Sequence, residues 1–357
     1  MRRLLILSVL FFVAGRLHAQ SKNMDMYWID VEGGASTLIV SPAGESLLID
    51  TGFPDDDRDA KRIYAATQLA GLKKIDHVVI SHFHTDHVGG LAALVKMIPV
   101  ERFYDHGDGI EPENLHWLKD YQAISAGKRT IVKAGDEIPM KGLHVLVVAS
   151  DEHIIAKPVN GGGAPNPLCE NAQQMAKAAP ENQRMVGLLL SYNKFKYLNL
   201  IDLDWEKDME LACPINRLGT VTVYQTGRHG SLDDAGSPPF LGAIKPQVVI
   251  VNNGPRKGLG QVDDRTPLIT TPGHEAAPYE KNSYLRLAKI PGIEDIWQGH
   301  LSLLDSNPQH NTSRDMIANF EETAECKGNW IAASVEPGGA FTVTNGRNGF
   351  AKTYAAR

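Results

Sequence analysis

Short apolar runs separated by turn residues dominate the chain and predict a sheet-rich protein. The runs contain many β-branched residues and are bounded by glycine and proline clusters, which is typical of strands. The expected strands are 26–31, 35–41, 46–50, 77–81, 142–150, 186–192, 196–202, 221–226 and 247–252. Helical periodicity predicts helices over 56–72, 91–98 and 111–126. Strands that alternate with helices in this way indicate a layered α/β domain.

The pattern gives no reason to divide residues 20–357 into two domains. Residues 156–182 are rich in Gly, Pro, Asn and Ala and predict the longest loop, and long loops are often functional. The tail, about 310–357, is expected to form a C-terminal extension of the same domain. Its segment 341–346 ends in Asn-Gly, which predicts a hairpin at a sheet edge.

The first nineteen residues have the pattern of a secretory signal. Arg2 and Arg3 precede an apolar run over 4–14, and 17–19 end on a small residue. The run is too short to span a bilayer as a permanent helix, although a single N-terminal anchor is the alternative. No later stretch is apolar enough to cross a membrane. We therefore expect a periplasmic or secreted protein.

The net charge of the chain limits the classes of partner that it is expected to bind. The 36 Lys and Arg against 42 Asp and Glu give 36 − 42 = −6. Removing Arg2, Arg3 and Arg16 with the signal leaves −6 − 3 = −9 for the mature chain. An acidic protein without a basic cluster is a poor candidate for binding long nucleic acids, so a small-molecule substrate is expected. The sequence does not predict the oligomeric state.

The three cysteines are Cys169, Cys213 and Cys326, and none forms a CxxC pair. A cysteine zinc knuckle is therefore excluded. Export permits one disulfide, and the polar, loop-like surroundings of Cys169 and Cys326 favour these two as the pair. Three free buried thiols remain the alternative.

The chemistry concentrates in one segment directly after the apolar run 77–81. Three histidines and one carboxylate fall within six residues there, namely His82, His84, Asp86 and His87. Imidazole and carboxylate are preferred ligands of zinc and similar divalent metals. In an extended segment, positions 82 and 84 project to the same side and can share one metal. The following Gly89-Gly90 allow a tight turn into the next helix.

Two later segments can complete a metal site. Asp202 and Asp204 lie at the end of a strand, where a carboxylate can point into a cleft and bridge two cations. The phase of the strand favours Asp202, and solvated loop acids are the alternative. His229 follows the run 221–226, and the histidine cluster upstream favours a ligand over a structural role.

These residues carry a resemblance to a known family. HFHTDH followed by Gly-Gly resembles the motif of the metallo-β-lactamase superfamily. The segment 28–52, together with YLNLIDLDW and GRHGS, resembles the ComEC-type branch of that superfamily. The resemblance covers residues 26 to about 255. It implies an αββα four-layer sandwich with the metals at one edge.

The resemblance also implies a ligand set and two divalent cations, zinc first, with manganese or iron possible. It assigns His82 and His84 to the first metal, Asp86, His87 and His229 to the second, Asp202 between them, and Asp50 to support of the loop. Such outer support fixes the orientation of the ligands.

The chain departs from the family pattern at three points. Ile201 replaces the glycine that usually precedes the bridging acid, and Arg228 replaces the first of two histidines. The mid-chain ligand to the first metal has no clear match, and His153 is the nearest candidate by position, with a surface role as the alternative. These departures place strict two-metal occupancy in doubt.

The function that these residues predict is an exported metal-dependent hydrolase. A water bound to the metals loses its proton near neutral pH and attacks a phosphodiester, ester, lactone or β-lactam bond. Asp86 would orient this hydroxide or take its proton. The alternatives are an iron-dependent oxidoreductase on the same fold, such as a sulfur dioxygenase, and a non-catalytic binding protein with a degraded site. Arg256 and Lys257 lie in a Gly/Pro-rich turn that could cradle an anion or be a plain surface turn.

Overall fold

The computed structural model describes most of the chain after the first residues. The described residues are 23–170, 172, 174–175, 180–231, 235–260, 268–269 and 282–357. The predicted signal, residues 1–19, lies outside them. Among the described residues, no helix combines the length and the apolar character that crossing a membrane requires.

The first of two large sheets has nine strands in the order β20-β19-β18-β1-β2-β3-β4-β5-β6. Its strands are β1 (Met24–Trp28), β2 (Thr37–Val40), β3 (Ser46–Ile49), β4 (Ile75–Val79), β5 (Val100–Asp105), β6 (Arg129–Ile131), β18 (Ile331–Val335), β19 (Phe341–Asn345) and β20 (Ala351–Tyr354). Strands β3 to β6 are parallel to one another, whereas the other pairs are antiparallel. The C-terminal hairpin β19–β20 forms an edge of this sheet, as its Asn-Gly turn predicted. The tail therefore contributes β18, β19 and β20 to the first sheet, and β17 to the second.

The second large sheet has the order β17-β16-β14-β13-β12-β11-β8-β7, with β9 paired to β8. Its strands are β7 (Glu137–Met140), β8 (Leu143–Ser150), β9 (His153–Ile154), β11 (Gly187–Tyr192), β12 (Phe195–Asn199), β13 (Val223–Gln225), β14 (Val248–Val251), β16 (Asp295–His300) and β17 (Ile317–Asn319). The strands from β12 to β17 are parallel. A separate two-stranded ribbon pairs β10 (Gln174–Met175) with β15 (Leu268–Ile269).

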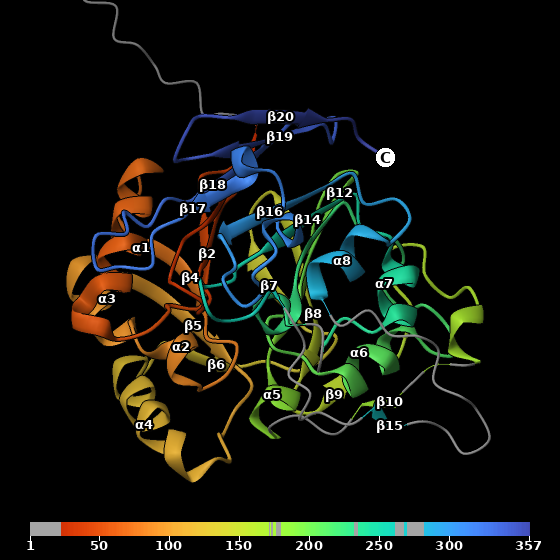
Figure 1. Cartoon of the computed structure of the whole chain (residues 1–357). Helices are drawn as coiled ribbons and strands as arrows, with labels where there is room; N and C mark the ends of the chain where they lie inside the picture. The colour runs from red at the N-terminus through yellow and green to blue at the C-terminus, as the bar shows by residue number, and fades with distance from the viewer. Residues whose placement is uncertain are drawn as a thin grey trace, which may run out of the picture.

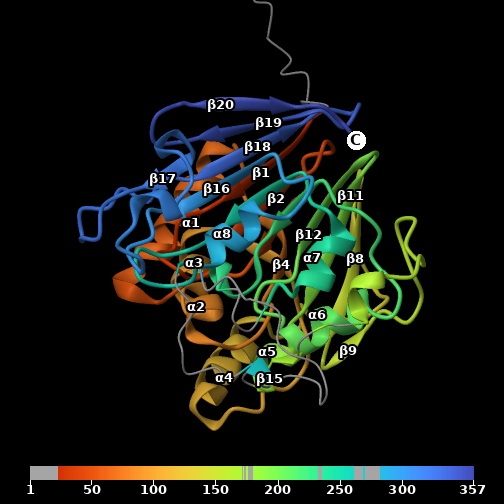
Figure 2. The ribbon, with the colours of Figure 1, turned by 45° about the vertical axis from the view of Figure 1, so that its right-hand side comes forward.

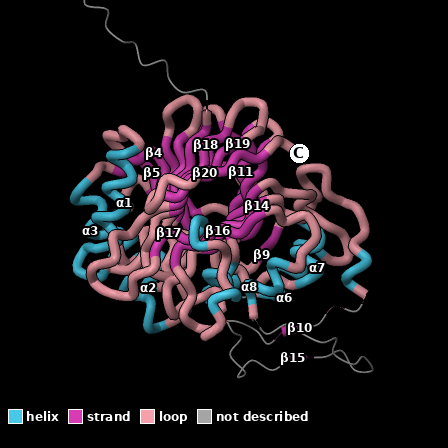
Figure 3. The backbone as a smooth tube through the Cα atoms, turned by 45° about the horizontal axis from the view of Figure 1, so that its top comes forward, coloured by secondary structure: helices cyan, strands magenta, loops and turns pink. Residues whose placement is uncertain are grey.

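Helices cover the outer faces of both sheets, with the strands between them (Figures 1 and 2). The first sheet is covered by α1 (Arg58–Leu69), α3 (Leu91–Met97) and α4 (Leu115–Ile124), and the second by α6 (Trp205–Ala212), α7 (Pro238–Ile244) and α8 (Ser283–Ala288). Two short helices, α2 (Thr85–Val88) and α5 (Pro180–Arg184), follow loops near one end of the strands. Figure 3 shows the strands in the centre and the helices outside them. The predicted αββα sandwich is confirmed.

Successive apolar side chains on the strands of the first sheet pack on opposite faces, one against the helices and the other against the second sheet. In β2 and β3, Leu38 and Leu48 belong to the apolar cluster that packs against α1 and α3. Their neighbours Ile39 and Leu47 belong to the cluster between the two sheets. Successive side chains on a strand point to opposite faces, so strands that are apolar on both faces lie between two packed layers.

The parallel strands bring several chain segments to one edge of the sandwich. The carboxyl ends of β3 and β4 in the first sheet, and of β12 and β13 in the second, lie at the same end of the molecule, because the residues that follow these strands contact one another. In open parallel sheets, ligands bind outside the carboxyl ends of the strands. The segments after these four strands carry the predicted metal-site residues.

The cysteine prediction was wrong in its pairing. Cys169 is bonded to Cys213, with a Cα–Cα distance of 5.8 Å, and Cys326 is a free, buried thiol. Cys213 directly follows α6, and the loop that carries Cys169 packs beside that helix. The proximity arises from tertiary packing over a sequence separation of 44, which the local character of each segment does not reveal.

Candidate metal centre

The loop of residues 82–90, here called the metal loop, follows β4 and is held between two other loops. A Cβ on Gly34 would lie 2.5 Å from the carbonyl oxygen of Asp86, and one on Gly90 would lie 2.2 Å from that of Thr51. The backbone contacts are close enough that only glycine fits at either position. The β1–β2 loop and the loop after β3 therefore fix the path of the metal loop.

The first group of ligand atoms comes from both sheets. His82, His84 and Asp202 place one ligand atom each within 4.8 Å of one another. His82 Nε2 lies 2.9 Å from His84 Nδ1, because residues 82 and 84 project to the same side of the extended chain. Asp202 follows β12 and reaches this pair across the sandwich edge.

The second group lies beside the first. Asp86, His87 and His229 likewise place ligand atoms within 4.8 Å of one another. Asp86 Oδ2 is 3.3 Å from His87 Nε2 and 3.1 Å from His229 Nε2. The two oxygens of Asp202 lie 3.5 Å from the same two nitrogens, so this carboxylate faces both groups.

Asp50 supports the metal loop from behind, as the resemblance implied. Its Oδ2 accepts from His87 Nδ1 at 2.8 Å and from the Ser81 hydroxyl at 2.7 Å, while Oδ1 accepts from the Ser81 N–H at 2.7 Å. Ser81 Oγ in turn lies 3.0 Å from His82 Nδ1. These contacts hold the Nδ1–H tautomer of both imidazoles, which leaves the Nε2 lone pairs for ligands.

Two further supports escaped the sequence reasoning. Glu111 Oε2 lies 2.8 Å from His84 Nε2, which leaves His84 Nδ1 directed at the first group. The Asn252 side-chain nitrogen lies 3.0 Å from His229 Nδ1 and donates to the Gly34 carbonyl. Both residues occur in polar loops without a motif, so only the folded chain shows their role.

The donor set fits divalent cations. His87 Nε2, His229 Nε2 and Asp202 Oδ1 are buried and make no hydrogen bond, although they lie close together. Buried polar atoms are nearly always paired, and atoms grouped without hydrogen-bond geometry are typical of ligands that converge on a cation. Imidazoles and carboxylates together suit zinc, manganese or iron.

Burial and the charges of neighbouring side chains shift the pKa values of the histidines in both ligand groups. Burial lowers the pKa of His82 well below its ordinary value, and the neighbouring His87 and His84 lower it further. Burial would also lower the pKa of His87, but Asp86, Asp202 and Asp50 raise it well above its ordinary value.

Burial opposes ionisation of the two carboxylates as well. Even so, His87 and His229 hold the pKa of Asp86 well below its usual range, and His229, His87 and Arg228 do the same for the pKa of Asp202. The site is therefore a concentrated pair of ionised carboxylates among imidazoles.

Two side-chain cations approach these carboxylates from outside. Arg228 Nη1 lies 3.1 Å from Asp202 Oδ2, and Lys257 Nζ contacts Asp86 Oδ2. Lys257 is 43% exposed and Arg228 is 27% exposed, so both stand at the mouth of the site. The turn that the sequence marked as a possible anion cradle thus reaches the metal centre through Lys257, whereas Arg256 pairs with Glu322.

Two sequence candidates lie apart from the ligand groups. His153 was expected as a ligand, but β9 turns it outward, its side chain is exposed, and its Nδ1 contacts the Asp151 carbonyl at 2.5 Å. Asp204 instead caps α6 by accepting from the Lys207 N–H. Ile201 adopts a φ of 42°, the left-handed conformation that glycine favours and that the family pattern anticipated.

The fold and this arrangement of ligands define the class of protein. The family model described as the metallo-beta-lactamase superfamily matches residues 29–165, which include the metal loop. The chain has the metallo-β-lactamase fold, with candidate metal ligands at the edge of its αββα sandwich.

Individual relatives are distant. Recombination protein 2 of Haemophilus influenzae is 24% identical over 228 residues, which is 63% of this chain and 24% of that protein. Ribonuclease Z of Methanopyrus kandleri is 30% identical over 120 residues, which is 33% of this chain and 40% of that protein. The metallo-beta-lactamase fold protein YhfI from Bacillus subtilis has 10% identity and a TM-score of 0.44, over 77% of this chain and 96% of YhfI. The matched regions thus span less than half of each of these two curated relatives.

Proposed function

We propose that this protein is an exported metal-dependent hydrolase that cleaves a phosphodiester bond in a small anionic substrate. The observation that carries the proposal is the pair of buried ligand groups that share Asp202 at the carboxyl ends of the strands. Divalent cations bound there would lower the pKa of a coordinated water to about 7 and polarise the bond under attack.

Residues of the chain would orient the water, accept its proton and hold the imidazoles in place. Asp86 lies in the second group with one carboxylate oxygen against His87 and His229. From this position it orients the attacking water and accepts its proton. Asp50, through Ser81 and His87, keeps the imidazoles in the ligating tautomer. No serine or cysteine nucleophile is required.

The side-chain cations at the mouth favour an anionic substrate. With divalent cations held by Asp86 and Asp202, these carboxylates would no longer balance the positive charges of Lys257 and Arg228. Both side chains are partly exposed, so they can turn to phosphate oxygens at the same mouth. Arginine and lysine are the side chains that most often bind phosphate. The name of the relative ribonuclease Z, an enzyme of phosphodiester cleavage, supports this substrate class.

The test is a hydrolysis screen with chromogenic phosphodiester, ester, lactone and β-lactam substrates, each with zinc, manganese and a chelator. We expect turnover of the phosphodiester that the chelator abolishes. Turnover of only a neutral ester or lactam would overturn the substrate class. Full metal binding without turnover of any substrate would favour the binding-protein alternative, and bound iron with oxygen uptake would favour the oxidoreductase.

A matched pair of variants separates the two cationic positions in the turn. Lys257→Ala is expected to raise KM for the phosphodiester about tenfold, a loss typical of one charge-assisted contact. Arg256→Ala removes an equal charge from the adjacent position, which pairs with Glu322 instead, and should leave KM unchanged. Equal effects of the two variants would contradict direct contact of Lys257 with the substrate.

Export and the ComEC-type branch are parts of the same proposal. The Cys169–Cys213 disulfide supports an oxidising compartment, because such bonds are rare in the cytosol. The match to Recombination protein 2 over 63% of the chain supports the branch. Fractionation of cells that express the full chain tests export, and a cytosolic protein with reduced cysteines would contradict it.

A further inference from the structure

A second cluster of ligand-type side chains lies outside the metal centre. Asp30, His300 and Cys326 each place one ligand atom within 4.8 Å of the others, and all three side chains are buried. Asp30 follows β1 of the first sheet, His300 ends β16 of the second, and Cys326 lies between β17 and β18. The cluster therefore joins the two sheets and the segment that connects them.

The geometry within the cluster is that of converging ligands. His300 Nε2 lies 2.8 Å from Asp30 Oδ1, yet neither ring nitrogen of His300 makes a hydrogen bond, and the residue is fully buried. Cys326 Sγ lies 3.7 Å from Asp30 Oδ2. The metal centre shows the same combination of close contact and unpaired, buried nitrogen at His87 and His229.

Neighbouring groups orient the carboxylate of Asp30 by hydrogen bonds to its two oxygens. Arg62 donates to Asp30 Oδ2 at 3.1 Å and to the Cys326 carbonyl at 2.8 Å, and the Glu32 N–H donates to Asp30 Oδ1. Glu32 also pairs with Arg62 and so balances its charge. Carboxylate ligands of metals are commonly held by such outer hydrogen bonds.

From this geometry we infer that Asp30, His300 and Cys326 form a separate site for a zinc-like divalent cation. A thiolate, an imidazole and a carboxylate are ligands that zinc accepts. The thiolate and carboxylate charges equal the charge of the cation, so the buried site becomes neutral. This inference rests on different residues from the proposed function and does not depend on it.

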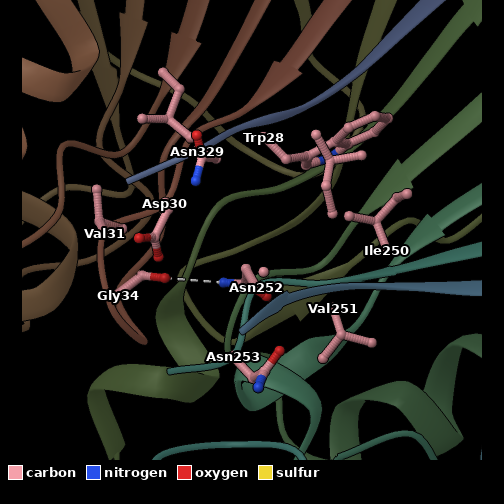
Figure 4. A pocket seen from close by; sticks show the side chains of 12 residues that line it. Trp28, Asp30, Val31, Gly34, Ile250, Val251, Asn252, Asn253 and Asn329 are labelled. Carbon is pink, nitrogen blue, oxygen red and sulfur yellow. Dashed lines mark hydrogen bonds between the residues drawn. The ribbon is translucent and has the colours of Figure 1, made fainter. Parts of the chain in front are cut away.

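A cation at this site would cross-link the two sheets close to the metal centre. Three protein ligands would leave one coordination position of a four-coordinate cation. A small hollow lies beside Asp30 and is lined also by Asn253, Gly299 and Asn329 (Figure 4). Asn252 lines the same hollow and contacts His229, so the hollow lies between this cluster and the metal centre. A cation bound only by the folded chain stabilises it.

Cobalt(II) substitution tests the inference, because thiolate ligation gives a charge-transfer band in the near ultraviolet. The metal centre has only nitrogen and oxygen ligands, and Cys169 and Cys213 are bonded to each other, so only Cys326 can supply a thiolate. The experiment loads metal-stripped full chain, with its disulfide intact, with cobalt(II) and records its spectrum.

We expect the wild-type chain to show the thiolate band and Cys326→Ser to lose it. His84→Ala, the matched change in the metal centre, should retain the band. His300→Gln should also weaken it, which keeps the test decisive if the serine variant does not fold. The inference is overturned if the wild-type chain shows no such band although a thiol titration confirms that Cys326 is reduced. In that case a protonated His300 pairs with Asp30 in place of a cation. The inference is also overturned if the band persists in folded Cys326→Ser.

Discussion

Asp50→Asn probes how the residue behind the ligands controls the metal centre. Asp50 is fully buried, and its φ of 61° lies in the left-handed region that asparagine tolerates, so the backbone can persist. The Ser81 N–H requires an acceptor, which places the amide oxygen of the introduced side chain in the position of Oδ1. The amide nitrogen then faces His87 Nδ1 and the Ser81 hydroxyl, where Asp50 now accepts two hydrogen bonds.

This exchange of an acceptor for a donor reverses the imidazole tautomers. His87 Nδ1 must accept from the amide, which moves its proton to Nε2, the atom directed at Asp86 and Asp202. The Ser81 hydroxyl can then donate to His82 Nδ1, with the same result there. Restoring the ligating tautomer leaves a buried donor unpaired, which costs about 1–3 kcal/mol, or about 5- to 150-fold in metal affinity.

The assay is zinc titration of metal-stripped protein in competition with a chromophoric chelator. Asp105→Asn is the matched control, because Asp105 is also a fully buried acid and lies at the end of β5 in the same sheet. Asp105 binds Arg129 and Tyr121 rather than a ligand, so this variant should lose stability but keep its zinc affinity. Wild-type affinity in folded Asp50→Asn would refute the tautomer argument.

Three other perturbations test the fold around the site. Replacing Cys169 and Cys213 by Ser should lower the free energy of unfolding by about 4 kcal/mol, from a separation of 44 residues, and an unchanged denaturant midpoint would contradict this. Gly34→Ala should weaken zinc binding, because its Cβ would lie 2.5 Å from a carbonyl of the metal loop, whereas Gly338→Ala has open space and should not. Burial raises the pKa of Asp208 to about 8, so the folded state retains a proton that the unfolded chain releases near pH 4. Stability should therefore fall by a few kcal/mol as pH rises from about 4 to 8, and thermal melts of Asp208→Asn should lack this slope.

The local part of the site was predictable from the sequence. His82, His84, Asp86 and His87 lie within six residues, so the strand and the turn alone set their relative positions. The phase of the strand before Asp202 predicted that this carboxylate points into the cleft, and the structure places its oxygens 3.5 Å from His87 Nε2 and His229 Nε2. The apolar runs predicted a layered α/β domain and its helices over 56–72, 91–98 and 111–126, whereas the two-sheet sandwich was implied by the family resemblance, and α6, α7 and α8 were not predicted.

The remaining parts depend on contacts between distant segments. Cys169 meets Cys213 only because the loop before α5 packs on α6, and β16 was missed because its run is interrupted by Gln298 and Gly299. Asp30 and Cys326 are 296 residues apart in sequence, and neither stands in a motif. No local pattern encodes such pairings, since each segment is compatible with many neighbours.

The departure at Arg228 has a physical interpretation in the finished structure. Two ionised carboxylates that are buried together repel each other and require compensating charge. Arg228 supplies that charge to Asp202, and Lys257 supplies it to Asp86, each from the mouth of the site. The folded chain thus balances its two buried carboxylates without a cation. An arginine in place of the first of the two histidines therefore removes a potential ligand but leaves the two ligand groups intact, which is consistent with a retained site rather than a degraded one.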